Sequence, residues 1–226
     1  MERNLTAGSL VRNMAAFSLP YLLSYLMQTL YGMADLFIMG QFGSIADITS
    51  VSVGSQFMHF VTVVLVGLAV GSTVCIAQSV GAGDRDKSSL YVGNTTSVFI
   101  VVALVMMAIL LLLVRWIVGA VSTPAEAFEG TVAYLKICFL GIPFITAYNI
   151  IAAVFRGIGD SKSPMYFIAV ACVLNVALDY LFIGAFNMGA AGAALATVIS
   201  QSVSVVVAVI YISLIGRRES GSSVFS

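Results

Sequence analysis

Long apolar runs joined by short polar connections make up most of the chain. Each run holds about twenty residues or more, and a helix of that length crosses the ~30 Å hydrocarbon core of a bilayer. The pattern therefore predicts an all-α polytopic membrane protein, with residues 1–226 forming one domain that is a bundle of six transmembrane helices. The predicted spans are residues 13–40, 51–78, 90–114, 132–154, 164–184 and 190–215.

Composition agrees with this assignment. Hydrophobic residues make up 60% of the chain and charged residues only 9%, whereas about a quarter of the residues are charged in a soluble domain. The formal net charge is zero and no basic block occurs, so we expect no nucleic-acid partner.

The cationic residues fall unevenly on the two sides of the predicted membrane. Eight of the ten lie at the termini or in the second and fourth connections, and only Arg115 and Lys136 lie on the other side. By the positive-inside rule, both termini are expected to be cytoplasmic. The eight are Arg3, Arg12, Arg85, Lys87, Arg156, Lys162, Arg217 and Arg218.

Two acidic residues lie well inside apolar spans. Asp179 follows Asn175 by four positions in the fifth span, and Asp35 follows Tyr31 by four in the first, so each pair shares one helix face. A carboxylate at the centre of a span costs about 2.5 kcal/mol or more and is typical of ion or proton pathways.

Spacing predicts that polar groups from three spans meet at one depth. Asp35 lies eight residues before Gly43, Asp179 seven before Phe186 and Thr197 eight after Gly189, so each lies roughly 10–12 Å from the membrane edge opposite the termini. Gln28 lies two turns deeper on nearly the same face as Asp35. Such oxygen atoms suit a hard cation or shared protons, and the spacing does not choose between Na⁺ and H⁺.

Two further residues inside spans stand out. Pro20 is expected to kink the first span, because proline has no N–H group for the helical ladder. His59, in the second span, is either an interior histidine satisfied by its neighbours or a proton relay, and the sequence does not assign its role.

Four stretches resemble the multidrug and toxic compound extrusion (MATE) family of cation-coupled antiporters, specifically its N-terminal six-helix lobe. They run in order through nearly the whole chain, which makes the resemblance more specific than any single motif. The stretches are ADLFIMGQFGS (34–44), AQSVGAGDRDK (77–87), FRGIGDSKSPM (155–165) and NVALDYLFIG (175–184).

The resemblance implies a site. The family's N-lobe cation site maps to Asp35, Asn175, Asp179 and Thr197, which would hold Na⁺ or protons. By the same matching, Gln28, Tyr31 and Asn149 belong to the substrate cavity or its coupling network, and Pro20 is the helix-1 residue proposed to bend on protonation.

The function expected from this resemblance is secondary active multidrug efflux, in which lipophilic or cationic organic compounds leave in exchange for Na⁺ or H⁺. The chain is expected to be a non-enzyme without a cofactor, multi-pass in the plasma (inner) membrane. Family members have two related lobes with the cavity between them. A second six-helix lobe is therefore an expected partner, from a missing C-terminal half or by dimerisation.

Two alternatives remain at this stage. A lipid-linked saccharide flippase of the same superfamily would keep the fold but is expected to line its cavity with cationic residues, and no Arg or Lys lies mid-span here. The GIGD of residues 157–160 also resembles the GxGD motif of intramembrane aspartyl proteases. Asp160 would then need a second carboxylate near the same membrane edge, where only Asp84 and Asp86 qualify.

Overall fold

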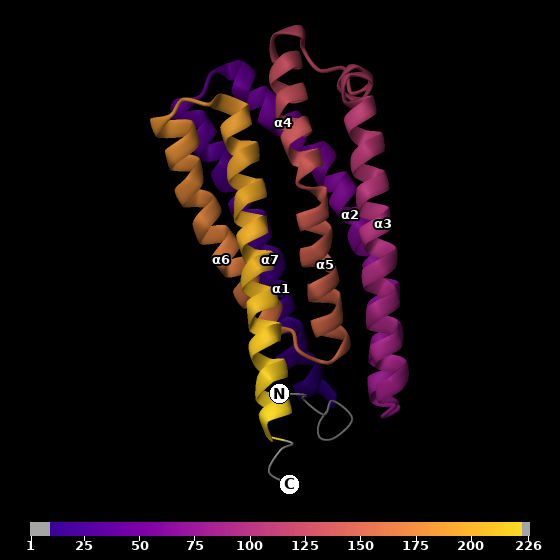
Figure 1. The fold of residues 1–226 in the computed structure, drawn as a ribbon. Coiled ribbons are helices and arrows are strands. Elements are labelled where there is room, and N and C mark those ends of the chain that lie inside the picture. The colour runs from indigo at the N-terminus through magenta and orange to yellow at the C-terminus, as the bar shows by residue number, and fades with distance from the viewer. Residues whose placement is uncertain (1–9, 223–226) are drawn as a thin grey trace.

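The computed structural model describes residues 10–222, and these residues form helices and short connections without a strand (Figure 1). The helices in chain order are α1 (Leu10–Phe42), α2 (Ile45–Gly81), α3 (Arg85–Ala120), the 3-10 turn η1 (Ala125–Ala127), α4 (Phe128–Leu140), α5 (Ile142–Gly157), α6 (Lys162–Asp179), the π-helical turn η2 (Tyr180–Ala185) and α7 (Gly189–Ser222).

The predicted all-helical membrane bundle is confirmed. Within the described residues, five helices are long and apolar enough to cross a bilayer, and a sixth crossing results if the bent pair of α4 and α5 counts as one span. Large apolar side chains cover the outside of the bundle; Leu112, Trp116 and Val173 are 85%, 71% and 73% exposed. Such a surface is stable against lipid tails and not against water.

The fourth predicted span is broken at its midpoint. The segment formed by η1 and α4 meets α5 at an angle of 49°. The Gly141 N–H donates to the carbonyls of Ile137 (3.1 Å) and Cys138 (3.0 Å) and closes α4. Pro143, in the first turn of α5, has no N–H to continue the α4 ladder. The apolar run does not reveal this break, because Gly and Pro interrupt the backbone pattern without adding polarity.

The fifth span also changes at its end. After Asp179 the α-helix gives way to the wider π-helical turn of η2, and the Phe186 N–H donates to the Leu181 carbonyl five residues earlier (3.0 Å). Single π-helical turns inside membrane helices often accompany functional side chains. Here the turn begins immediately after a buried carboxylate.

The helices form two groups. In one group α6 packs against both α1 and α7, and in the other α3 packs against α4 and α5, with α2 alongside (Figure 1). Contacts of α7 with α4 and α5, and of α2 with α1 and α7, join the two groups. The start of α1 and the end of α7 lie at the same end of the bundle, together with the α2–α3 and α5–α6 connections (Figure 1). We call this the terminal end. Of the eight cationic residues expected on the side of the termini, Arg3 and the side chains of Arg12, Arg85, Arg217 and Arg218 lie outside the part of the chain that the structure describes.

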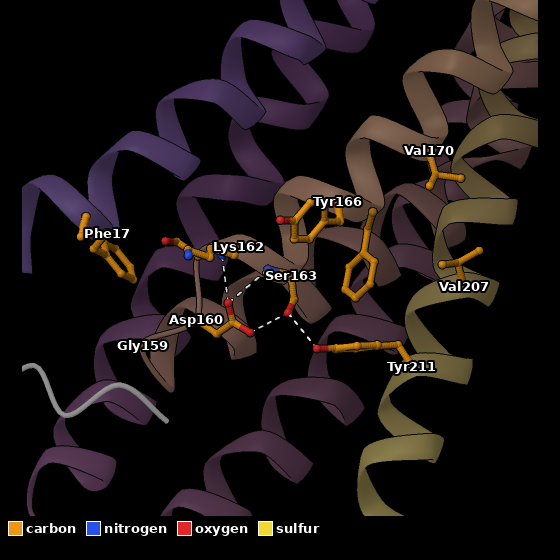
Figure 2. A pocket seen from close by; sticks show the side chains of 12 residues that line it. Phe17, Gly159, Asp160, Lys162, Ser163, Tyr166, Val170, Val207 and Tyr211 are labelled. Carbon is orange, nitrogen blue, oxygen red and sulfur yellow. Dashed lines mark hydrogen bonds between the residues drawn. The ribbon is translucent and has the colours of Figure 1, made fainter. Parts of the chain in front are cut away.

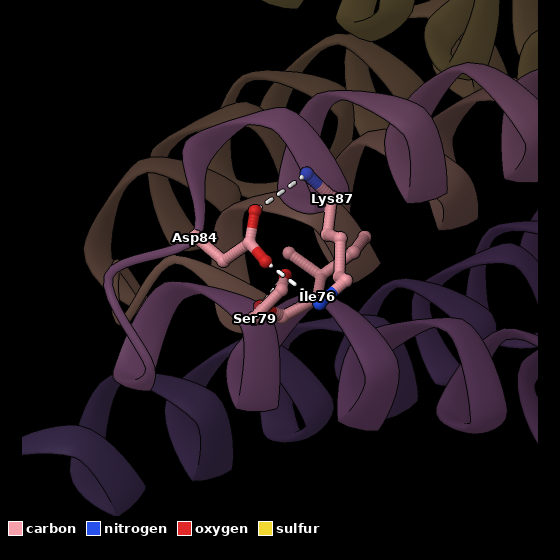
Figure 3. Close-up of polar contacts among 4 residues, drawn as sticks. All are labelled: Ile76, Ser79, Asp84 and Lys87. Atoms are coloured by element: carbon pink, nitrogen blue, oxygen red, sulfur yellow. Dashed lines mark hydrogen bonds and ion pairs between the residues drawn. The ribbon is translucent and has the colours of Figure 1, made fainter.

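The α2–α3 connection at the terminal end is held by Asp84 (Figure 3). Its Oδ1 accepts the Lys87 N–H (3.0 Å) and caps α3, and its Oδ2 pairs with Lys87 Nζ at 2.8 Å. These bonds from Lys87 keep the pKa of Asp84 below its usual range. On α2, the Ser79 hydroxyl turns back to the Ile76 carbonyl (2.9 Å).

At the opposite end, Asp47 joins α2 to α7. Its carboxylate accepts the Ser44 N–H (3.2 Å), and its own N–H donates to Ser44 Oγ (3.1 Å), which makes a capping box. The carboxylate also accepts the Ser44 hydroxyl (2.7 Å) and the Ala190 N–H (3.3 Å). Gly189 precedes Ala190 with φ of +55°, and a Cβ built there would lie 2.5 Å from Asp47 Oδ1. The close approach of the two helix starts therefore requires glycine at this position.

This requirement gives a prediction. Gly189→Ala should lower the thermal midpoint of the purified chain, because a positive φ costs a non-glycine residue about 1 kcal/mol or more and the new methyl group displaces Asp47. Gly67→Ala is the control, since a Cβ at Gly67 meets nothing within 4 Å. It should be neutral or stabilising by up to about 1 kcal/mol. Equal midpoints for the two variants would contradict the assignment.

Candidate cation site and cavity

The four residues that the family resemblance assigns to a cation site lie together between α1, α6 and α7. Asn175 Nδ2 donates to Thr197 Oγ1 (3.4 Å), and the Thr197 hydroxyl donates to Asp35 Oδ2 (3.4 Å). Asp179 follows Asn175 by one turn and lies close enough to Asp35 for the two carboxyl groups to interact electrostatically. Asp35, Asn175 and Asp179 are 5%, 1% and 0% exposed.

Several oxygen atoms of this cluster lack a hydrogen-bond donor within the described residues. They are Asp35 Oδ1, Asn175 Oδ1 and both carboxyl oxygens of Asp179. A buried acceptor without a donor is costly, and two neighbouring carboxyl groups cannot both be ionised without a compensating positive charge. Converging carboxylate and amide oxygens fit a hard monovalent cation, and equally a proton on one carboxyl group.

A cavity of about 450 Å³ adjoins the cluster. Asp35 and Thr197 line it, so the same two residues face both the cluster and the cavity. Gln28, Tyr31 and Asn149 also line it, and their role toward a substrate stays a prediction. Asn149 Nδ2 donates to the Ile145 carbonyl one turn back (2.8 Å), so its amide oxygen and its second N–H are the groups that remain for another partner.

Pro20 lies away from this cavity wall. It is buried in α1, which is helical on both sides of it, and its carbonyl accepts the Ser24 hydroxyl (2.8 Å). The Pro20 ring leaves the Ala16 carbonyl without its usual helical donor. The bending of α1 at this position stays a prediction.

Sequence reasoning missed Gln201 and did not assign His59, and both line the cavity. Gln201 lies one turn after Thr197 on α7, is 6% exposed, and has no donor to its Oε1 among the described residues. Its four-residue spacing from Thr197 was the available signal. His59 projects from α2, and its side chain is exposed.

A second cavity, of about 720 Å³, lies at the terminal end between α1, α6 and α7 (Figure 2). The connection from Gly159 to Ser163 forms part of its wall, and Phe17, Tyr166 and Tyr211 add aromatic rings. Gly159 has φ of +86°, which explains glycine in this tight turn.

Asp160 in that turn caps α6. Its Oδ1 accepts the N–H groups of Lys162 (2.9 Å) and Ser163 (3.1 Å), and its Oδ2 accepts the Ser163 hydroxyl (2.6 Å), as Figure 2 shows. The Ser163 hydroxyl also lies 3.4 Å from that of Tyr211 on α7. Both carboxyl oxygens are thus engaged in holding the turn, which weakens the hypothesis that Asp160 activates water in a protease.

Known proteins resemble this chain in sequence and fold. A family model described as MatE matches residues 20–181. The chain is 30% identical over 207 residues to the "Probable multidrug resistance protein YpnP" of Bacillus subtilis, covering 92% of this chain and 46% of that protein. It is also 30% identical over 196 residues to the "Probable multidrug resistance protein NorM" of Thermotoga maritima, covering 85% and 42%.

A solved structure supports the fold. It is described as the outward-facing conformation of a multidrug resistance MATE family transporter of the MOP superfamily, and it matches with a TM-score of 0.83 and 23% identity. The match covers 91% of this chain and 45% of that one. The chain thus spans about half the length of the curated relatives and of the solved structure it matches.

The capping role of Asp160 is testable. Asp160→Ala should lower the thermal midpoint by the loss of a helix cap, which costs about 1 kcal/mol. Asp160→Asn should recover most of the loss, because its amide oxygen still accepts the two N–H groups. A midpoint unchanged by Asp160→Ala, measured in the same detergent, would show that the cap contributes little to stability.

Proposed function

The chain belongs to the MatE family, and from this premise we propose that it forms one lobe of a cation-coupled exporter of small organic compounds. One observation carries the proposal. Buried carboxyl and amide oxygens without donors, from Asp35, Asn175 and Asp179, lie beside a cavity that Asp35 itself lines. An ion bound there and a compound in the cavity would share a wall.

The coupling ion is Na⁺ or H⁺. Either one neutralises the carboxyl pair, Na⁺ by direct contact with the free oxygens and H⁺ by joining one carboxyl group. In both cases the electrostatic conflict between Asp35 and Asp179 is relieved, so the favoured separation of α1 from α6 changes with occupancy. That change is how an ion gradient would alter the cavity.

In this mechanism α1 is the moving element. It carries Asp35 at the cluster, Gln28 and Tyr31 at the cavity wall, and Pro20 nearer its start. A proline inside a membrane helix is a common hinge. We propose that loss of charge repulsion at Asp35 bends α1 at Pro20 and reshapes the wall that contacts the exported compound.

The cavity wall favours organic cations over anionic headgroups. Among its described lining residues are amides, hydroxyls and aromatic rings, with no Arg or Lys. Aromatic faces attract cations, and a wall without fixed positive charge does not hold phosphates. This composition supports drug export over transport of a lipid-linked saccharide.

A complete transporter requires a second six-helix lobe. The chain spans about half the length of the relatives it matches, and one lobe would supply one wall of a central cavity. The second lobe would come from further polypeptide or from a second chain.

We further propose that the protein is in the plasma (inner) membrane with its terminal end in the cytoplasm. Lys87, Arg156 and Lys162 lie in or beside the connections at that end. The opposite end has fewer cationic residues among those described, namely Arg115 and Lys136, and by the positive-inside rule the end with more Lys and Arg faces the cytoplasm.

The ion site can be tested without the second lobe. The thermal midpoint of the purified chain is measured in NaCl and in KCl at equal ionic strength, for the wild type, Asp179→Asn and Asp86→Asn. Ligand at a hundred times its Kd stabilises by about 2.7 kcal/mol. We expect a Na⁺-specific or acid-dependent increase that Asp179→Asn loses and the exposed-site control Asp86→Asn keeps. A midpoint that responds equally in all three proteins would remove the carboxyl pair from the mechanism.

A further inference from the structure

His59 contributes an exposed imidazole to the lining of the 450 Å³ cavity. It lies on α2, and its ring is exposed beside Gln56 and Thr62 in the lining of the 450 Å³ cavity. No group of the described residues forms a hydrogen bond with the imidazole that would fix its proton, and an ordinary imidazole gains or loses a proton between about pH 5 and 8.

The described lining holds further titratable groups beside His59. They are Tyr25, Tyr31 and Asp35 on α1, Tyr134 and Cys138 on α4, and Tyr148 on α5, while the described residues of α3 and α7 contribute none. Phenols and thiols are ordinarily neutral at pH 7. Asp35 is 5% exposed and is turned into the cluster with Thr197, Asn175 and Asp179.

We propose that His59 selects cavity ligands by charge, so that the neutral imidazole admits organic cations and the protonated one excludes them and favours organic anions. The inference rests on the proposed export function, and it assigns a specificity residue outside the ion cluster. Among the described residues of the wall there is no Arg or Lys to mask the effect.

The size of the effect follows from the cavity's surroundings. Two unit charges a few ångströms apart interact by several times the thermal energy when the effective dielectric constant is about 20. Protonation of His59 should therefore change the affinity for a singly charged ligand by about tenfold or more. It should do so in opposite directions for cations and anions.

Two ions of one shape and opposite charge provide the test. Tetraphenylphosphonium and tetraphenylborate binding is measured for the 226-residue chain in lipid nanodiscs, with empty discs as blanks. His59→Gln fixes the neutral state and His59→Arg fixes the positive state. Comparing these two variants at pH 8 alone avoids any titration of the ion cluster. Gln78→Arg is the matched control, because it adds the same charge to α2 at an exposed position outside the cavity lining.

At pH 8 we expect His59→Arg to bind tetraphenylphosphonium about tenfold more weakly than His59→Gln, and tetraphenylborate more tightly. Gln78→Arg should match the wild type.

Two results would overturn the proposal in distinguishable ways. Tight cation binding that is equal in His59→Arg and His59→Gln would reject charge selection and leave the export function standing. Binding of neither ion by the wild type would reject the cavity as an organic-ion site, and the selection by His59 with it.

Discussion

Two carboxyl groups buried among apolar helices impose the constraint on which the arrangement of this bundle depends. Asp35 and Asp179 come from helices far apart in sequence, and an isolated carboxylate in this setting is strongly unfavourable. The compensating groups come from the same elements: Asn175 one turn from Asp179, and Thr197 on α7, which bridges Asn175 and Asp35. The packing of α1 on α6 and of α6 on α7 is therefore tied to how well this cluster is satisfied.

Much of this arrangement could be predicted from the sequence. Apolar run length alone located the spans, since the requirement to satisfy every backbone group in lipid leaves little freedom. A common depth for Asp35, Asp179 and Thr197 was predicted by counting residues to the membrane edge, because a helix converts sequence separation into depth at a fixed rise. Asn175 was added by its four-residue spacing from Asp179 and by the family resemblance.

The features that the sequence did not reveal are changes in helix direction and contacts between different helices. Gly141 and Pro143 lie in an apolar run, so a hydropathy pattern continues through the bend between α4 and α5. The π-helical turn after Asp179 adds no polar residue and leaves no trace in composition. Gln201 on α7 and His59 on α2 line the same cavity. The sequence of either helix alone does not show this, because it depends on how the two helices pack.

The broken fourth span has a consequence for how the protein enters the membrane. The thirteen-residue α4 and sixteen-residue α5 would each reach only about 20–24 Å, short of the hydrocarbon thickness. Neither half can cross alone, so the two must leave the insertion machinery as one unit whose midpoint is bent and lacks a ladder bond. The long uninterrupted helices α2 and α3 are both synthesised earlier, and both pack against α4 and α5. We therefore expect the bent span to complete its crossing against the surface that α2 and α3 already provide.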